Sequence, residues 1–220
     1  MDKLNINGIG MTSQRTRDRL IDQLIVKGIG NEEVIRTLRK LPRHLFMDEA
    51  LANRAYEDEA LPIGHGQTIS QPYIVARMTE LLIEEGIPEH VLEVGTGSGY
   101  QAAVLGALVK ELHTVERIEP LYRNTRNLLY DLGYRNIRTH LSDGSWGWAQ
   151  AAPYEAIIVT AAPDTIPQSL LDQLIVGGRL VIPVGGQNNS QQLQRITKIA
   201  DDNYEIENLD EVLFVPLVLN

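Results

Sequence analysis

Residues 91–100, with the sequence VLEVGTGSGY, constrain the fold of this chain more than any other segment. The first four residues are typical of a buried strand. The glycines at 95, 97 and 99 then give the backbone the freedom that a tight turn and a closely approaching ligand require, and a helix is expected from Tyr100 onward. This order indicates a nucleotide-type cofactor site in an α/β sheet, while an ordinary strand-to-helix turn is the plainer interpretation.

The spacing of the glycines distinguishes two classes of cofactor. A dinucleotide-binding turn has the pattern GxGxxG, but Tyr100 occupies the position of its third glycine. The run is therefore GxGxG, and an acidic residue, Glu93, precedes the first glycine by two positions. This pattern resembles motif I of the class I S-adenosylmethionine-dependent methyltransferases.

Glu116 follows the next predicted strand, residues 112–115. Ligands of open α/β sheets bind outside the carboxyl ends of the strands, where a carboxylate can accept hydrogen bonds from both hydroxyls of a ribose. A solvated charge paired with Arg117 or Lys110 is the alternative interpretation of Glu116.

A third predicted strand, residues 137–141, ends shortly before Asp143 and Gly144. In folds of this kind that position lies beside the adenine of the cofactor. Asp143 is also typical of a turn, because Asp and Gly are common turn residues. Both interpretations of Asp143 are open at this point.

Composition favours one domain with a large core. The chain has 220 residues, 43% of them hydrophobic, and no linker rich in Pro, Gly or Ser divides it. We expect a single methyltransferase domain over residues 1–220. Within it we expect a flexible extension at 1–11, a helical and substrate-loop region at 12–89 and the cofactor-binding core at 90–220.

Charge and residue content argue against several classes of function. The net charge of −9 argues against nonspecific binding to nucleic acid or to an anionic membrane, since basic surfaces drive both. No apolar run is long enough to span a bilayer, and no basic stretch followed by a hydrophobic one begins the chain, so a cytoplasmic protein is expected. The absence of cysteine excludes disulfides and thiolate chemistry. No metal is expected, because the five histidines lack metal-ligand spacing: His44, His65, His90, His113 and His140.

Hydrophobic periodicity predicts helices first and an alternation of strands and helices afterwards. We expect helices over residues 13–28, 31–42, 72–85, 100–110, 120–132 and 167–175. We expect strands over residues 91–94, 112–116, 137–141, 156–160, 179–184, 191–200 and 211–219. The predicted fold is a doubly wound, mostly parallel Rossmann-like α/β sheet with N-terminal helices and an antiparallel C-terminal edge.

The segment before the glycine-rich run, residues 64–73, is a second candidate site. Its sequence, GHGQTISQPY, combines backbone freedom, hydroxyl groups and a helix start, and function concentrates in loops held by rigid elements. Ser70 lies just before Pro72, and serine followed by proline is also a common start of a helix. Spacing alone leaves both a helix cap and a substrate contact open for Ser70.

Residues 66–73, GQTISQPY, resemble the signature of the protein-L-isoaspartate O-methyltransferases. The resemblance continues to residue 82 and includes LPIG at 61–64, VER at 115–117, AIIVTAAP at 156–163, GGRLVIPVG at 177–185 and FVPL at 214–217. It departs at His65, where related bacterial sequences often have glutamine, and at residues 1–10, for which no counterpart is expected. Such enzymes methylate the misplaced α-carboxylate of L-isoaspartyl residues, and the ester collapses to a succinimide that can reopen as aspartate.

The resemblance implies roles for individual residues. Ser70 is implied to be the active-site serine, and Thr68 and Ile69 are expected to shape the wall beside it. Val215, next to Pro216 on a predicted edge strand, is a candidate main-chain partner for an extended peptide. Contacts with S-adenosylmethionine are implied for Glu93, Gly95, Thr96, Gly97, Ser98, Gly99, Glu116, Asp143 and Gly144.

The chemistry also fits the residues without the resemblance. A carboxylate, with a reference pKa of about 4, is ionised near pH 7, so its attack on a sulfonium methyl needs no general base and no catalytic triad. Alignment of the reacting atoms is what the protein must supply, and such alignment is worth roughly 7 to 11 kcal/mol. Isoaspartyl peptides and proteins are the expected partners, and the oligomeric state is left open. A methyltransferase with another substrate and a noncatalytic Rossmann-like protein are the alternatives.

Overall fold

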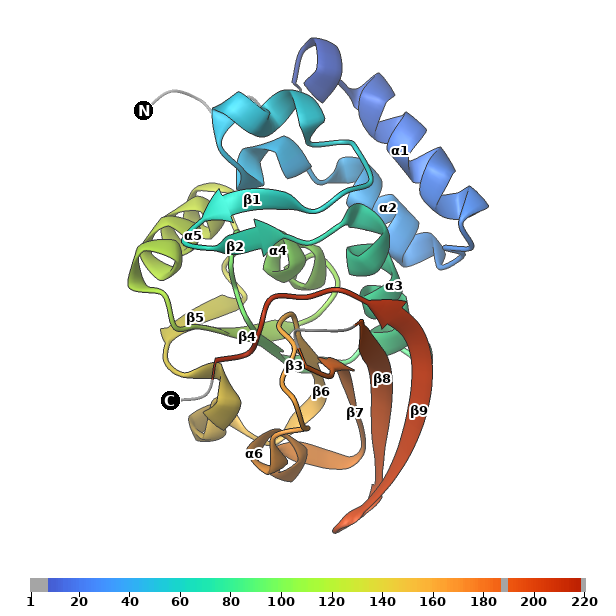
Figure 1. Cartoon of the computed structure of the whole chain (residues 1–220), viewed down its shortest axis with the longest axis vertical. Helices are drawn as coiled ribbons and strands as arrows, with labels where there is room; N and C mark the ends of the chain where they lie inside the picture. The colour runs from blue at the N-terminus through green and yellow to red at the C-terminus, as the bar shows by residue number, and fades with distance from the viewer. Residues whose placement is uncertain (1–7, 187–189, 219–220) are drawn as a thin grey trace.

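The computed structural model describes residues 8–186 and 190–218. The spatial order of the strands in its larger sheet is β5-β4-β3-β6-β7-β8-β9 (Figure 1). The strands are β3 (His90–Val94), β4 (Glu111–Glu116), β5 (Ile137–Leu141), β6 (Tyr154–Val159), β7 (Leu174–Val184), β8 (Gln191–Ala200) and β9 (Asn203–Val212). The first five strands in the spatial order pair in parallel, and β8 and β9 extend β7 in antiparallel pairing. The predicted fold class is confirmed.

Helices cover the sheet, and a small hairpin lies beyond its strand ends (Figure 1). The helices are α1 (Gln14–Val26), α2 (Glu32–Lys40), α3 (Pro72–Ile83), α4 (Tyr100–Gly106), α5 (Glu119–Asp131) and α6 (Gln168–Asp172). The hairpin consists of β1 (Leu61–Gly64) and β2 (Gln67–Ile69). Strand β2 lies within residues 64–73, for which the sequence suggested a loop. Within the described ranges no helix has the length and apolarity needed to cross a membrane.

Alternation along the central strands separates two hydrophobic cores. Val91 of β3 and Ala156 of β6 are fully buried in a core that includes residues of α1 to α4. Their neighbours Leu92 and Ile157 point to the opposite face, where they pack with Leu170 of α6. Successive side chains of a strand face opposite sides, so both faces of β3 and β6 are covered.

One helix ends earlier, and one strand begins earlier, than the sequence predicted. Helix α4 ends at Gly106, not at residue 110, because the side-chain amide of Asn136 donates to the carbonyls of Gly106 and Val109, both at 2.9 Å. Strand β7 begins at Leu174, inside the helix predicted over 167–175. A register shift in its pairing with β6 lets the strand continue through Gly177, which has a φ of +84°.

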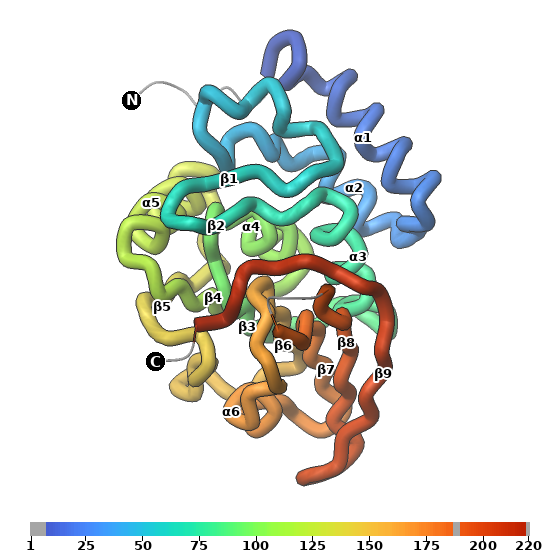
Figure 2. The backbone as a smooth tube through the Cα atoms, viewed as in Figure 1, coloured from blue at the N-terminus to red at the C-terminus, as the bar shows by residue number. Residues whose placement is uncertain are grey.

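The last strand lies earlier in the chain than the predicted range 211–219. A tight turn with Asp202 at φ +57° leads directly into β9, which pairs with β8 along most of its length. After β9 the chain leaves the sheet edge and crosses the ends of the parallel strands, as Figure 2 shows. Residue 219 lies outside the described residues.

The histidines are less scattered in space than in sequence. His113 stacks on His140 with ring centroids 5.1 Å apart, and His90 lies 5.4 Å from His113. Burial lowers the pKa of His140 to about 4 and also lowers the pKa of His113. Both imidazoles are therefore neutral at pH 7. His65, in contrast, lies exposed in the turn between β1 and β2, with φ +54°.

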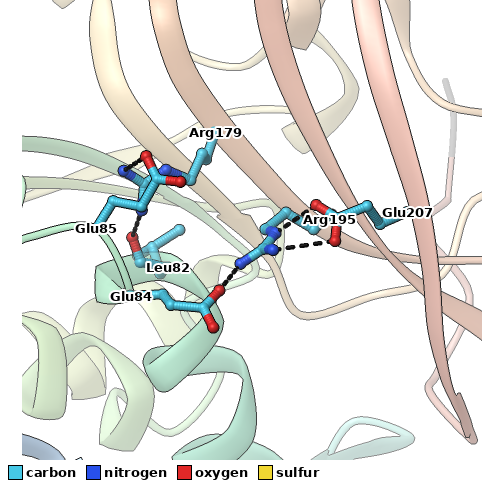
Figure 3. A network of polar contacts seen from close by, with 6 residues as sticks. All are labelled: Leu82, Glu84, Glu85, Arg179, Arg195 and Glu207. Carbon is cyan, nitrogen blue, oxygen red and sulfur yellow. Dashed lines mark hydrogen bonds and ion pairs between the residues drawn. The ribbon is translucent and has the colours of Figure 1, made fainter.

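Two arginines of the sheet form hydrogen bonds with the C-terminal end of α3 (Figure 3). Arg195 of β8 donates to Glu207 of β9 at 2.8 and 3.0 Å and also to Glu84. Arg179 of β7 donates to the Leu82 carbonyl at 3.3 Å. Because α3 begins beside Ser70, these contacts fix the direction of the helix that follows the second candidate site.

Replacing Arg195 should destabilise the protein more than replacing an exposed arginine does. Arg195→Ala removes a bidentate pair from a side chain that is only 16% exposed, so we expect the free energy of unfolding to fall by about 1 to 2 kcal/mol. Arg54→Ala is the matched control, because Arg54 also pairs with two glutamates but its side chain is 42% exposed, so a smaller change is expected. Urea unfolding of both variants measures the difference, and equal losses would contradict it.

Candidate functional site

A cleft opens at the carboxyl ends of the parallel strands. β4 and β6 flank β3 on opposite sides there, and open α/β sheets bind ligands at such a switch point. The cleft is lined by the predicted residues Thr68, Ile69, Ser70, Gly95, Thr96, Gly97, Ser98, Glu116, Gly144 and Val215. Three other predicted site residues, Glu93, Gly99 and Asp143, are not among the described residues that line it.

Two glycines of the turn after β3 have no room for a side chain. Gly95 has a φ of +96°, and a Cβ there would lie 2.4 Å from the hydroxyl oxygen of Thr160. Gly99 has a φ of +83°, and a Cβ there would lie 2.5 Å from a methyl group of Thr125 on α5. Gly95 therefore lets the main chain border the cleft, whereas Gly99 allows close packing against α5.

Glu116 shapes this turn from the end of β4. Its Oε2 accepts the Gly97 N–H and its Oε1 accepts the Ile118 N–H, both at 2.8 Å. The residue is only 6% exposed, so it is not the solvated charge of the alternative interpretation. Each carboxylate oxygen has a second lone pair, and the side chain lines the cleft. This geometry fits a carboxylate that accepts hydrogen bonds from two neighbouring hydroxyls.

Glu93 is fully buried behind the turn. Its Oε2 accepts the Thr114 hydroxyl at 2.5 Å, and the Thr114 oxygen lies 2.6 Å from that of Thr96, which lines the cleft. Within the described residues its Oε1 has no hydrogen-bond partner. Burial raises the pKa of Glu93 to about 8, so the carboxyl group is protonated at neutral pH.

Asp143 and Gly144 occupy the end of β5 in different ways. The Asp143 carboxylate accepts the backbone N–H of Ser145 at 2.9 Å and its hydroxyl at 2.8 Å, the arrangement of a turn residue. Gly144 lines the cleft, and a Cβ there would lie 2.5 Å from Val94.

Ser70 does not cap α3. The N-cap is Gln71, and its side chain makes no capping hydrogen bond. Asp58 supplies the acceptor instead, because its Oδ1 accepts the Tyr73 N–H at 2.8 Å, while its Oδ2 pairs with Lys27 at 2.5 Å. The helix-cap interpretation of Ser70 is wrong, since a carboxylate 15 positions before Tyr73 takes that role.

A second cleft adjoins the first. The two clefts share Thr68, Ser70, Thr160 and Val215. Ser70 therefore lies where a ligand in one cleft would meet a ligand in the other.

The wall opposite Ser70 comes from the segment after β9. The Ala162 N–H donates to the Val215 carbonyl at 2.8 Å, and the Leu217 N–H donates to the Ala162 carbonyl at 2.9 Å. The prediction that Val215 lies on an edge strand is therefore wrong, because β9 ends at Val212. The Val215 carbonyl already accepts a hydrogen bond from Ala162. The path of this segment across the strand ends, below β1 and β2, is visible in Figure 2.

Several residues of the cleft were not predicted. The main ones are Gln101, Arg117, Thr160, Pro216 and Leu217. Thr160 had a signal in the sequence, because it ends the strand predicted over 156–160, and β6 (Tyr154–Val159) borders the switch point. Pro216 and Leu217 belong to the motif at 214–217, but only the tertiary path of the chain after β9 brings them to this cleft.

Comparisons with known proteins agree with this geometry. The family model of protein-L-isoaspartate(D-aspartate) O-methyltransferases (PCMT) matches residues 15–220. This chain belongs to that family. A protein-L-isoaspartate O-methyltransferase of Halorhodospira halophila is 55% identical over 99% of this chain and 98% of its own length. A protein-L-isoaspartate O-methyltransferase of Pseudomonas aeruginosa is 56% identical over 94% of this chain and 98% of its own length. The first alignment leaves at most a residue or two of this chain unmatched, so the expected lack of a counterpart for residues 1–10 is wrong.

Solved structures of PCMT proteins share the fold. A protein-L-isoaspartate O-methyltransferase, 27% identical, superposes with a TM-score of 0.80 over 91% of this chain, which spans 65% of that longer protein. A putative family member from Plasmodium falciparum, solved in complex with S-adenosyl-L-homocysteine, is 24% identical, with a TM-score of 0.78 over 93% of this chain.

The protonated state of Glu93 predicts a pH dependence of stability. Between its ordinary pKa of 4.5 and about 8, the folded protein keeps a proton that the unfolded chain releases. Stability should therefore fall as pH rises through this window, by at most about 1.4 kcal/mol per pH unit. Glu93→Gln lacks the titrating group, so its decline should be smaller. Urea unfolding at several pH values across this window tests this, and parallel pH profiles of the two proteins would show that Glu93 is not held neutral.

Proposed function

We propose that this PCMT protein transfers a methyl group from S-adenosylmethionine to the free α-carboxylate of L-isoaspartyl residues in peptides and proteins. One observation carries the proposal: two clefts meet at Ser70, within the segment that bears the family's signature. The methyl ester leads through a succinimide back to aspartate. The whole chain is assigned to one methyltransferase domain, in which residues 90–220 bind the cofactor and residues 12–89 contribute the substrate loop.

The first cleft fits the cofactor. Bound S-adenosylmethionine supplies a methyl carbon that a carboxylate oxygen attacks while the carbon–sulfur bond breaks. Glu116 would accept the ribose hydroxyls through the lone pairs that the Gly97 and Ile118 amides leave over. The main chain around Gly95, which lines the cleft, would border the sulfur-bearing chain. Glu93 would act indirectly, by orienting Thr96 through the Thr114 hydroxyl.

Ser70 would hold the substrate carboxylate at the junction of the clefts. Its hydroxyl can donate one hydrogen bond without protonating a carboxylate, which leaves the attacking oxygen charged. Because Asp58 satisfies the start of α3, the Ser70 hydroxyl is not required for the helix. Thr68 and Thr160 line the same junction and would complete the wall around the carboxylate.

The second cleft would take the peptide that carries the isoaspartyl residue. Its further lining includes Gln71, Ile74, Ser190, Glu211, Val212, Leu213 and Phe214. Leu213 is 82% exposed, which leaves an apolar side chain at the rim for contact with a peptide. The carbonyl of Val215 already accepts a hydrogen bond from the Ala162 N–H. A peptide that pairs with the main chain after β9 would therefore bond to other backbone groups of that segment.

A methyl-transfer assay on paired peptides tests the function. Labelled S-adenosylmethionine is offered with a peptide that contains L-isoaspartate and with the same peptide containing L-aspartate. We expect ester formation only with the isoaspartyl peptide. Equal labelling of both peptides, or labelling of neither while another methyl acceptor reacts, would assign the chain a different substrate.

Ser70→Ala should reduce turnover while leaving stability nearly unchanged. The lost hydrogen bond to a charged group predicts a decrease in kcat/KM of about 10- to 150-fold. Asp58→Ala is the matched comparison, because removing the cap of α3 should cost about 1 kcal/mol of stability or more. Melting temperatures and initial rates are measured on the same preparations. A Ser70→Ala protein that melts lower but keeps its wild-type rate would place the substrate contact elsewhere.

Glu116→Gln should weaken cofactor binding. Losing the charge and one acceptor predicts an increase in the Kd of S-adenosylhomocysteine of about 10- to 150-fold by calorimetry. Glu119→Gln is the control, because Glu119 is exposed beside Arg123 and lies outside the cleft. The melting temperature is checked as well, since Glu116 also supports the Gly97 turn. An unchanged Kd would remove Glu116 from the cofactor site.

A further inference from the structure

Three side chains with metal-binding groups meet at the amino ends of β3 and β4, the opposite end of these strands from the cleft. His90 and Glu111 are paired across the two strands, and His113 lies two residues after Glu111, on the same face. One ligand atom from each of the three lies within 4.8 Å of the others. The methyl-transfer site uses none of these residues.

One ring nitrogen of His90 is not used by a hydrogen bond within the described residues. Its Nδ1 lies 3.2 Å from the carbonyl oxygen of Pro153, which can only accept, so Nδ1 carries the hydrogen. The lone pair of the neutral ring is then on Nε2. That nitrogen is buried and has no hydrogen-bond partner in the described part of the chain. A hydrogen bond from the other ring nitrogen to a carbonyl is the usual support of a metal-binding histidine.

His113 and Glu111 are already spaced as two ligands of one ion. The Nε2 of His113 lies 3.5 Å from a carboxylate oxygen of Glu111. Ligands at about 2.0 to 2.1 Å from a tetrahedral Zn²⁺ are about 3.4 Å apart. The Nδ1 of His113 contacts His140 at 3.0 Å, and His140 stacks on Trp148, so the ring is fixed. The side chain of Glu111 is 47% exposed, which leaves a path from solvent.

We propose that His90, Glu111 and His113 bind a divalent transition-metal ion of the Zn²⁺ type, with water as the fourth ligand. Two imidazoles and one carboxylate suit Zn²⁺, whereas Mg²⁺ and Ca²⁺ prefer oxygen ligands only. Arg138 lies 4.0 Å from the same Glu111 oxygen, and binding displaces this weak, largely exposed contact. The ion would join the starts of β3 and β4 and stabilise the folded chain by mass action.

Calorimetric titration of the untagged full chain with Zn²⁺ tests the proposal. We expect one equivalent to bind the wild-type protein, and His90→Ala and Glu111→Gln to bind at least tenfold more weakly. His65→Ala is the control, because His65 is exposed in the β1–β2 turn, and it should bind as the wild type does. Zn²⁺ should also raise the melting temperature of the wild type and of His65→Ala, but not that of Glu111→Gln.

Two results would overturn the site. One is the absence of saturable Zn²⁺ binding by the wild type, and the other is equal affinity in the wild type, His90→Ala and Glu111→Gln. Because Glu111 is partly exposed, its variant should fold, and circular dichroism without metal verifies this. Methyl transfer by Glu111→Gln should match the wild type, so the test does not depend on the proposed function.

Discussion

The two hydrogen bonds that the Glu116 carboxylate accepts from Gly97 and Ile118 set the geometry on which the cofactor cleft depends. A glycine-rich turn is free to adopt many conformations, and this freedom has to be removed before the turn can present a defined surface. Glu116 removes it from the neighbouring strand, and the hydroxyl of Thr160, bonded to Gly95, does so from the other side. The turn is therefore held between β4 and β6, with β3 behind it.

The substrate side is organised by a similar division of roles. Asp58 takes over the capping of α3, which a local serine could have supplied, and Arg195 anchors the far end of the same helix to the sheet. Ser70 is thereby left at the junction of the two clefts without a structural role in the helix start. A hydroxyl group in that position can bind a carboxylate by a single hydrogen bond, which suits a reaction that needs alignment more than proton transfer.

Opposite ends of the same strands carry different chemistry. The carboxyl ends of β3 and β4 border the cleft, while their amino ends bring His90 and His113 together. Between them lies Glu93, whose carboxyl group is kept neutral because burial removes it from water. The parallel arrangement separates these regions, since the five parallel strands present equivalent ends on the same side.

The amino-acid sequence alone was enough to predict the doubly wound sheet, the glycine turn and the position of Glu116. These follow from local periodicity and from the rule that parallel strands end at one edge. It left open whether Ser70 caps a helix, and it misplaced residues 211–219. Tertiary structure decided both, because the Asp58 cap and the contact of Val215 with Ala162 join residues far apart in the chain. Such contacts depend on how elements pack, and no short-range spacing encodes them.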